Sequence, residues 1–349
     1  MRILLISPLP PPAGGIATWT VMYKAYCQKH DIPLQIVNNA MMGARAEKNS
    51  TKRQLTSEIK RTLHVLKDLK MQLRTAKPDV VHLNTSCSKF GIFRDCLCVM
   101  RTSRAKVPMV LHCRCNIQDQ VKSKAAKWAF RRMVKLSAKV LTLNQRSFAY
   151  ANQFGEGKTV TVPNFIEQQS LCKRESVRET IQNVVFVGHM LKTKGVLEIL
   201  EAAKQLPQMR FVMLGAIRID LEQLQIPENV EFRGNQKREV VMEELRNADV
   251  FLFPSYTEGF ANAMTEAMAS GLPVITTDVG ANQEMIEDHG GLVVPVGDSD
   301  AIVDALNKLS GDPKQREKMS AWNIEKVERS YLQEPVMQQL LSIYREVSR

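Results

Sequence analysis

The sequence lacks a long apolar run. Its 349 residues contain no stretch of 18 or more consecutive apolar side chains, so no transmembrane helix is expected. The apolar opening Ile3–Ile6 is also too short for a signal peptide, and four prolines follow between Pro8 and Pro12. We interpret this opening as a buried β-strand.

Cysteine is present, but not in the pattern of a disulfide-bonded or zinc-binding protein. The count is seven, an odd number, which favours reduced thiols in a cytosol. The pairs Cys96-x-Cys98 and Cys113-x-Cys115 have one intervening residue, whereas structural zinc sites usually have two to four. Cys96 and Cys98 also fall in a predicted helix, where residues two apart do not face the same side. We therefore expect no metal site and a cytoplasmic protein.

The first half of the chain is poor in acidic residues. Residues 1–165 hold 28 Lys and Arg against 8 Asp and Glu, a net +20. Residues 166–349 hold 20 against 28, a net −8. Such asymmetry predicts two domains with different partners. A basic half attracts nucleic acid, anionic lipid or phosphorylated substrates.

Short apolar runs alternate with helix-like segments through both halves, which predicts an α/β protein with parallel sheets covered by helices. The predicted strands are 2–7, 34–37, 79–83, 109–112, 140–143, 183–187, 210–214, 230–232, 250–253 and 274–276. The predicted helices are 16–29, 51–76, 90–102, 123–136, 194–205, 237–247, 261–270, 299–309 and 313–330.

The length predicts two Rossmann-like domains. We expect an N-terminal domain at 1–164, a C-terminal domain at 165–330, and a helix at 331–349 that packs back toward the first domain. Residues 160–165 contain Pro163-Asn164 and are the expected linker. Open α/β sheets bind ligands beyond the carboxyl ends of their strands, so two facing domains would place a site in the cleft between them.

The strongest chemical motif follows the predicted strand 250–253. Glu258 lies in a loop, and Glu266 lies in the helix that starts near Ala261. A helix N-terminus suits a diphosphate, and carboxylates near it accept hydrogen bonds from sugar or ribose hydroxyls. The alternative is a pair of solvated glutamates, but the apolar neighbours of Glu266 form a poor solvent face.

The segment 254–275, PSYTEGFANAMTEAMASGLPVI, resembles the donor-site signature of family-four glycosyltransferases, which carries two glutamates at this spacing. The resemblance implies that Glu258 lies near the donor sugar hydroxyls and that Glu266 holds the ribose hydroxyls. It also implies that the sugar and phosphates are bordered by the backbone of Gly259, Phe260 and Ala261. Ala261 stands where the family often has Gly or Pro.

A second segment, 187–195, reads VGHMLKTKG and is similar to the family's phosphate-binding pattern G-R-L-x-x-x-K-G. The resemblance implies that Lys194 holds the leaving diphosphate. His189 stands where Arg is expected, and histidine is mostly neutral near pH 7. Either the bound diphosphate protonates His189, or another cation helps. The alternative is that Lys194 is an exposed lysine beside a helix start.

A third match is the glycine-rich loop 8–16 after the first strand. Gly14 and Gly15 allow close backbone approach, and the helix that follows would offer its N-terminus to the donor phosphates or the acceptor. An ordinary turn is the alternative. The Pro163-Asn164 pair resembles the family's hinge between the two domains.

Two histidines end predicted strands of the first half. His112 stands where the family commonly has a histidine close to the donor sugar, and His82 stands where a polar residue is frequent. The alternative for both is a hydrogen-bonded histidine beneath the cleft. Arg114, two residues beyond His112, is a candidate for the phosphate contact missing at His189. We take His112, Lys194 and Glu258 as the candidate catalytic residues.

Segment 123–138 predicts a basic amphipathic helix. Its apolar side chains are Trp128, Phe130, Met133, Val134 and Leu136, and its cations are Lys124, Lys127, Arg131, Arg132 and Lys135. Such a helix can lie on an anionic membrane, and the basic stretch 52–77 adds to this tendency. The alternative is a helix that covers the sheet with its basic side in water. No nucleic-acid-binding motif is present, so we do not expect a nucleic-acid partner.

The resemblance implies a retaining hexosyltransferase, with the N-terminal domain 1–164 on the acceptor side and the C-terminal domain 165–330 binding the nucleotide-sugar. It would move a sugar from a nucleotide-sugar to a glycan or lipid-linked acceptor in bacterial cell-surface polysaccharide synthesis, without a metal or other cofactor. It would be cytoplasmic, or peripheral on the inner membrane face. Two alternatives remain: a sugar-nucleotide epimerase of the same architecture, and a non-catalytic protein that binds membranes or nucleic acid.

Overall fold

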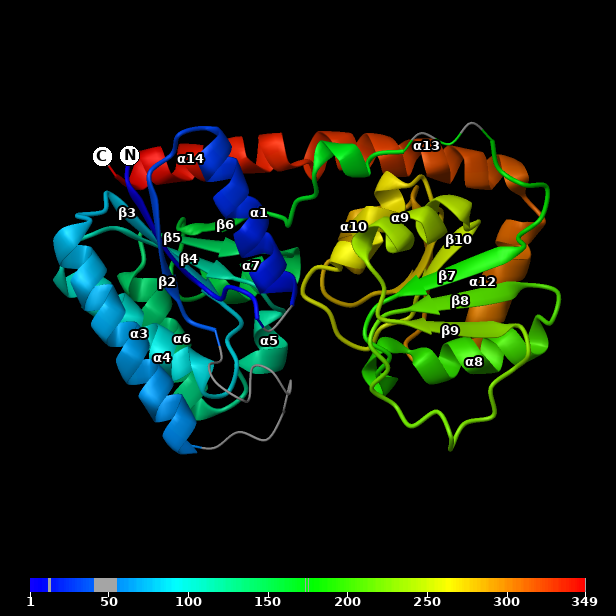
Figure 1. The fold of residues 1–349 in the computed structure, drawn as a ribbon, viewed down its shortest axis with the longest axis horizontal. Helices are drawn as coiled ribbons and strands as arrows, with labels where there is room; N and C mark the ends of the chain where they lie inside the picture. Colours follow the sequence, from blue (N-terminus) through cyan, green and yellow to red (C-terminus); the bar gives the residue numbers. More distant parts are fainter. Residues whose placement is uncertain (12–13, 41–54, 173, 175, 349) are drawn as a thin grey trace. The chain divides into compact units, whose positions relative to one another are not determined.

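The computed structural model describes residues 1–11, 14–40, 55–172, 174 and 176–348. The chain divides into two units, each built on its own six-stranded sheet (Figure 1). Unit 1 comprises Met1–Pro163 and Met337–Arg349, and unit 2 comprises Asn164–Val336. Within the described residues, no helix combines the length and apolar character that crossing a membrane requires.

The sheet of unit 1 is entirely parallel, and its strand order is β2-β1-β3-β4-β5-β6. Successive strands run outward in one direction from β1 and in the other from β3, so the order reverses between these two neighbours. This reversal is the topological switch point of unit 1. The strands are β1 (Ile3–Ser7), β2 (Leu34–Asn38), β3 (Val80–Thr85), β4 (Met109–Cys113), β5 (Lys139–Thr142) and β6 (Thr159–Thr161).

The helices of unit 1 bury their apolar sides on this sheet. Helices α3, α4 and α6 lie together against it, α4 between the other two (Figure 1). The helices are α1 (Gly15–Lys29), α3 (Leu55–Thr75), α4 (Gly91–Arg104), α5 (Ile117–Gln120), α6 (Lys124–Leu136) and α7 (Gln145–Asn152). The last helix, α14 (Gln333–Val347), joins this unit from Met337 onward.

The sheet of unit 2 is also parallel, with the order β12-β11-β10-β7-β8-β9, so its switch point lies between β7 and β10. Its strands are β7 (Asn183–Val187), β8 (Arg210–Leu214), β9 (Val230–Gly234), β10 (Val250–Phe253), β11 (Val274–Thr277) and β12 (Gly291–Val294). Its α-helices are α8 (Val196–Gln205), α9 (Arg238–Asn247), α10 (Asn262–Ala269), α11 (Asn282–Ile286), α12 (Ser299–Ser310) and α13 (Pro313–Ser330). Two 3-10 turns are η1 (Gln168–Ser170) and η2 (Lys192–Lys194).

Short elements were the ones that sequence patterns missed. β6 occupies the first part of the segment expected to be linker, so that prediction was wrong for residues 160 and 161. β12, α5, α7 and α11 were not predicted, because four to eight residues carry little periodic signal. The helix expected from residue 51 begins at Leu55 in the described part of the chain, and residues 51–54 lie outside that part.

Helix α14 contributes to the core of unit 1. Met337, Leu340 and Tyr344 are fully buried. The Tyr344 hydroxyl is hydrogen-bonded to Tyr23 at 3.2 Å and also to Nδ1 of His82. The C-terminal segment therefore supports the first sheet, although 173 residues of unit 2 separate it in sequence from the rest of unit 1.

Candidate functional site

The candidate site residues of unit 2 gather where β7 and β10 end. These strands are adjacent and parallel, so the loops that follow them leave the same edge of the sheet. The loop after β7 carries His189 and Lys194, and the loop after β10 carries Glu258. This is the switch point of unit 2, the place where doubly wound sheets bind their ligands.

The two loops are locked together by their backbones. Gly195 adopts φ +73°, and a Cβ at this position would clash with the Pro254 carbonyl. The Tyr256 amide donates a hydrogen bond to the Thr193 carbonyl at 3.0 Å. Only glycine allows this approach, so the Lys194-Gly195 pair of the motif fixes the lysine against the second loop. As predicted, the segment opens a helix, since α8 begins at Val196.

Lys194 and Glu258 form an ion pair between the two loops. Lys194 Nζ contacts Glu258 Oε1, and the Ser255 hydroxyl donates to the same oxygen at 3.0 Å. The side chains are 22% and 11% exposed, so the pair is partly removed from water and still open to a ligand. Lys194 Nζ also lies 5.6 Å from the centre of the Phe253 ring. The ion pair brings together two residues that the sequence separates by 64 positions.

The Glu258 loop is positioned from the other side by Gly280, which follows β11. Gly280 has φ +59°, and a Cβ there would clash with the Glu258 carbonyl. The Thr277 hydroxyl donates to the Ser255 carbonyl. Sequence reasoning did not select Gly280, and the only signal available was a glycine four residues after a predicted strand.

Helix α10 starts at the end of this loop without a side-chain cap. The residue before it, Ala261, makes no capping side-chain hydrogen bond. Asn262, the first helical residue, accepts a hydrogen bond from the Asn164 side chain at 2.6 Å. Phe260 and Ala261 are buried, and Phe260 packs edge-on against Tyr331 at 5.4 Å. The helix N-terminus is thus fixed in place, while its backbone carries no capping side chain.

Glu266 lies on α10 and is partly buried. Burial raises the pKa of its carboxyl group, and the positive charge of Arg238 acts in the opposite direction. Among the described residues, its carboxylate has no hydrogen-bond or ion-pair partner. A desolvated carboxylate without a partner is an acceptor available to ligand hydroxyl groups.

His189 is exposed and is surrounded by positive charge. Partial burial, Arg218 and Lys194 all lower its pKa, which favours the neutral imidazole. Arg218 lies in the segment after β8, is exposed, and its amide donates to the Met190 carbonyl at 3.1 Å. It is therefore a second cation beside His189 that sequence reasoning missed, because no motif connects it to the β7 loop. A pocket of about 570 Å³ opens here, lined by Leu191–Thr193, Leu197 and 218–220, among others.

In unit 1, His82 and His112 are both fully buried. Their rings stack at 5.3 Å, and burial is the main cause of the low pKa values, about 3 for His82 and well below the usual range for His112. His112 contacts Arg114 Nη1 at 3.3 Å and the Val162 backbone. With no exposed surface, His112 can touch a sugar only if a neighbouring side chain moves. Its expected contact with the donor stays a prediction.

Arg114 is buried with these histidines. Its guanidinium lies 4.4 Å from the centre of the Trp19 ring, and burial lowers its pKa to about 9. One of its nitrogens, Nη2, has no hydrogen-bond partner among the described residues. The proposed phosphate contact of Arg114 also stays a prediction.

The glycine-rich loop of unit 1 is described in part, since Pro12 and Ala13 lie outside the described residues. Gly14 precedes α1 in an extended conformation with open space around it, and Gly15 is the first helical residue. A small pocket of about 90 Å³ lies at the β1/β3 switch point. Its lining is Pro8, Ile16, Asn39, Glu58, Arg61, Asn84, Ser86, Ser88, Gly91 and Arg94.

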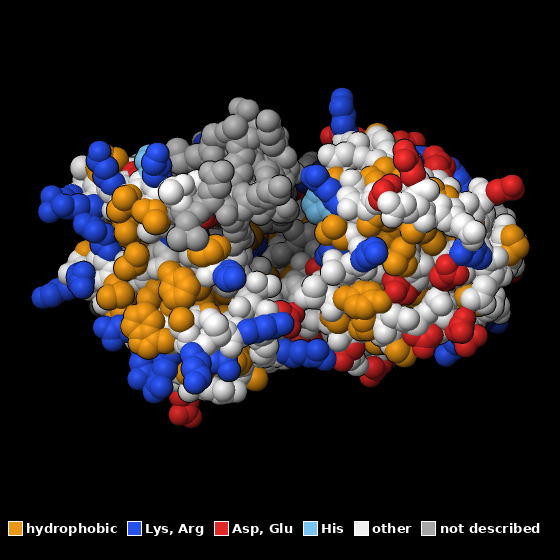
Figure 2. All heavy atoms as spheres, turned by 90° about the horizontal axis from the view of Figure 1, so that it is seen from below, with side chains coloured by type: hydrophobic (Ala, Val, Ile, Leu, Met, Phe, Trp, Pro, Cys, Tyr) orange, Lys and Arg blue, Asp and Glu red, His pale blue; other side chains and the backbone are white. Residues whose placement is uncertain are grey.

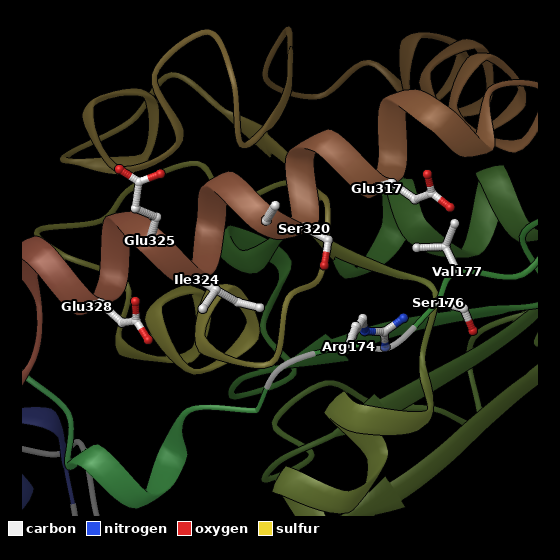
Figure 3. Close-up of a pocket in the computed structure, with 9 residues that line it drawn as sticks. Arg174, Ser176, Val177, Glu317, Ser320, Ile324, Glu325 and Glu328 are labelled. Carbon is white, nitrogen blue, oxygen red and sulfur yellow. The ribbon is translucent and has the colours of Figure 1, made fainter.

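Another pocket of unit 2, of about 570 Å³, lies between α13 and the residues Arg174, Ser176 and Val177 (Figure 3). Arg174 donates to the Ser270 carbonyl at 3.1 Å and to the Arg246 carbonyl at 2.9 Å. These carbonyls follow α10 and end α9, at the amino ends of β11 and β10. The pocket is therefore at the opposite edge of the sheet from Lys194 and Glu258, and its arginine serves to cap two helices.

The cysteine pairs are buried rather than clustered on a surface. Cys96, Cys98 and Cys113 are buried, and Cys115 is half-buried. In the part of the chain that the structure describes, no group of three His, Cys, Asp or Glu side chains is arranged to hold a metal ion.

The sequence is similar to a protein-family model and to several named proteins. Residues 168–325 match the family model described as "Glycosyl transferases group 1". A Bacillus subtilis protein named as the teichuronic acid biosynthesis glycosyltransferase TuaC is 26% identical over 260 residues, which are 70% of this chain and 64% of that protein. The capsular polysaccharide biosynthesis glycosyltransferase CapM of Staphylococcus aureus is 28% identical over 172 residues, 46% of this chain and 44% of CapM. The matches thus span less than two thirds of these relatives.

Solved structures extend the similarity to the whole chain at the level of fold. Sucrose-phosphate synthase from Thermosynechococcus elongatus has a TM-score of 0.78 at 17% identity, over 99% of this chain and 98% of that one. HepE from Anabaena, in complex with UDP, has a TM-score of 0.75 at 16% identity, over 99% and 100%. The predicted fold class is confirmed: the chain has the two-domain GT-B architecture, and nearly all of its second unit matches the group 1 glycosyl transferases.

Proposed function

We propose that the protein is a glycosyltransferase that moves a hexose from a nucleotide-sugar to a glycan or lipid-linked acceptor. The observation that carries this proposal is the arrangement after β7 and β10. A lysine, a paired glutamate, an uncapped helix N-terminus and an unpartnered glutamate occur in one strand-loop-helix region of unit 2. These groups fit the three parts of such a donor, namely its diphosphate, its sugar and its ribose.

The ion pair keeps Lys194 in place before the donor binds. When a diphosphate arrives, Lys194 turns to the phosphate oxygens, and Glu258 is released to accept hydrogen bonds from the sugar hydroxyls. The exchange replaces one charge-assisted contact of the lysine by another, so the lysine is never left as an unpaired, partly buried cation. Glu266 accepts hydrogen bonds from the ribose hydroxyls.

Catalysis then consists mainly of stabilising the leaving diphosphate. Lys194, the N-terminus of α10 and Arg218 place positive charge where negative charge develops. Arg218 takes the role that the family pattern gives to the arginine at the position of His189, because partial burial, Arg218 and Lys194 lower the pKa of that imidazole and favour its neutral form. We propose that transfer retains the anomeric configuration and needs no metal ion, as the family resemblance implies.

Relatives suggest the pathway and the first donor to test. TuaC and CapM are named for teichuronic acid and capsular polysaccharide biosynthesis, so we propose a role in cell-surface polysaccharide synthesis. HepE was solved with UDP-glucose, which makes UDP-hexoses the first candidates for this chain.

A thermal-shift panel of UDP-, GDP-, ADP- and CMP-sugars tests the proposal. We expect one nucleotide to raise the melting temperature, since a ligand at 100 times its dissociation constant stabilises a protein by about 2.7 kcal/mol. The sugar-nucleotide that does so should be consumed in the presence of an acceptor glycan, and a chelator should leave this turnover unchanged. If no sugar-nucleotide at millimolar concentration shifts the transition, the proposal is wrong.

A further inference from the structure

Large apolar side chains are exposed on three neighbouring helices of unit 1. Of the eight large apolar side chains exposed in the described part of this unit, six lie on α3, α4 and α6. Leu63 and Trp128 are the most exposed, at 63% and 62%. Figure 2, seen from the side where α3 and α4 lie in Figure 1, shows hydrophobic side chains gathered among basic ones on this unit. The six residues are Ile59, Leu63, Met71, Phe93, Leu97 and Trp128.

Helix spacing shows that these residues form outward faces. On α4, Phe93 and Leu97 are one turn apart and exposed, and Arg101 and Arg104 continue the same side. Ile92, Cys96 and Val99 form the inner side, which packs on the sheet. On α3, Ile59 and Leu63 are exposed, whereas Val65 and Leu69 are buried. Both helices are therefore apolar on two sides, and only one of these is covered.

Helix α6 corrects the expectation made from its sequence. Phe130, Met133 and Val134 belong to the core, because they lie on the side that faces the sheet. Only Trp128 is a large exposed apolar side chain there, and the other exposed apolar groups come from α3 and α4. The predicted amphipathic helix exists, but its apolar side is the covered one.

Basic residues surround this surface. The three helices hold thirteen Lys and Arg against three Asp and Glu, a net +10. None of the three acids is fully exposed: Glu58 is paired with Arg61 at 3.4 Å, Asp95 with Arg94 at 2.7 Å, and Asp68 accepts from Gln72 at 3.5 Å. On α6, the exposed cations are Lys124, Lys127, Arg131, Arg132 and Lys135.

We propose that the outer surface of α3, α4 and α6, here called the α3–α4–α6 face, docks on an anionic lipid bilayer. The exposed aliphatic and aromatic side chains would enter the headgroup region, and the Lys and Arg side chains would contact lipid phosphates. Long basic side chains can extend to the headgroups while their methylenes cover apolar surface.

Two other occupants fit this face less well. Nucleic acid would use the cations, but it offers no partner for Ile59, Leu63 or Leu97. A protein partner would use the apolar groups, but the cores of protein–protein interfaces are depleted in charged side chains, and lysine in particular. A bilayer accommodates both kinds of side chain. The apolar groups reach the boundary between headgroups and acyl chains, and the basic groups contact the lipid headgroups. The inference does not depend on glycosyl transfer.

Flotation with vesicles tests the proposal. The full chain should bind vesicles of phosphatidylcholine with about 30% phosphatidylglycerol and should not bind pure phosphatidylcholine. Added salt should weaken the binding, because the Debye length shortens to about 3 Å at 1 M salt. With about 1 kcal/mol per basic residue, the triple variant Lys127→Glu, Arg131→Glu, Lys135→Glu should bind on the order of 100-fold more weakly. A matched control, Lys24→Glu, Lys308→Glu, Lys318→Glu, changes the net charge equally at exposed sites outside this face and should bind nearly as well as wild type.

The apolar part of the face has its own readout. Trp128 is far more exposed than Trp19, so vesicle binding should shift the emission of the wild-type protein to the blue. The shift should be absent in Trp128→Ser, and Leu63→Ser with Leu97→Ser should weaken binding without changing the melting temperature by much. Three results would overturn the proposal: no binding to anionic vesicles at low salt, equal losses in the triple variant and its control, or tighter binding to an RNA oligonucleotide than to vesicles.

Discussion

The two units of this chain share a doubly wound parallel sheet but use charge differently. At the switch point of unit 2, Glu266 has no described partner, Lys194 is paired with Glu258, and Arg218 is exposed beside His189. At the switch point of unit 1, arginines lie in a small pocket and are already bound to acids, Arg61 to Glu58 and Arg94 to the adjacent Asp95.

The surplus cations of unit 1 lie instead on the outer helices. The difference teaches that net charge alone does not locate a site. The first 165 residues carry +20, yet the cations that we propose for phosphate chemistry belong to the second half, which carries −8. What matters is where the folded chain places each charged group and how far the group stays open to a ligand, and this depends on packing rather than on composition.

The largest effect is expected at Lys194. Lys194→Ala should lower turnover by about 100- to 1000-fold, since removal of one group that stabilises transition-state charge costs on the order of 3–4 kcal/mol. Binding of the sugar-nucleotide should fall much less, because the lysine meets charge that develops as the bond breaks. Steady-state kinetics together with calorimetry separate these two effects.

Lys192→Ala is the matched control, because Lys192 lies in the same 3-10 turn and is exposed. It should retain near wild-type turnover. The turnover of Arg218→Ala should lie between those of Lys194→Ala and Lys192→Ala, about tenfold below wild type, because Arg218 is a more exposed cation. Wild-type turnover in Lys194→Ala would show that the switch point of unit 2 is not where the leaving group is stabilised.

Much of the fold could be predicted from the sequence. Strand ends such as those of β7, β8 and β10 were placed correctly, because buried parallel strands are short, apolar and bounded by turns. The position of Glu258 in the loop after β10 was also predicted correctly, and the expected helix start near Ala261 is one residue from the observed start of α10. The strand order was not predicted. The sequence therefore did not show that β7 and β10 are neighbours, which is what brings Lys194 to Glu258.

Side-chain environment is the part that sequence could not provide. His112, at the carboxyl end of its strand, was expected near the cleft, yet Trp19 and Arg114 cover it. The contact with Trp19 joins elements that are far apart in sequence, and the contact with Arg114 depends on the rotamer of the arginine side chain. Similarly, the apolar residues of α3 and α4 look alike in a periodic pattern, and only the folded structure shows which side the sheet covers. Catalytic and donor-binding assignments therefore stay predictions.

An intermediate effect is expected at Glu266. Glu266→Ala should weaken binding of the nucleoside diphosphate by about ten- to hundredfold, corresponding to about 1.5–3 kcal/mol for a hydrogen bond to a charged group. Glu243→Ala, at an exposed site on α9, is the control and should bind normally. Calorimetry that finds unchanged affinity in a folded Glu266→Ala protein would remove Glu266 from the donor site.

The smallest effect concerns the stability of the free protein. Burial raises the pKa of Glu266 in the folded state, so its ionised form is less favourable there than in the unfolded chain. Below its unfolded pKa the group is protonated in both states and costs nothing. As pH rises through the folded pKa, the native protein must lose a proton that it holds more tightly than the unfolded chain does, so stability falls.

Glu266→Gln keeps the shape of the protonated acid and cannot ionise. The ligand-free variant should therefore melt at a higher temperature than wild type at pH 8, and the difference should shrink as the pH falls, because protonation makes wild-type Glu266 neutral. Other carboxylates titrate in both proteins and cancel in the difference. Asp95→Asn in unit 1 should have the opposite effect. It loses the buried ion pair with Arg94, so this variant should melt at a lower temperature than wild type at pH 8. If Glu266→Gln is less stable than wild type at pH 8, or if the difference is independent of pH, then Glu266 is already compensated in the folded chain and is not held ready for a ligand.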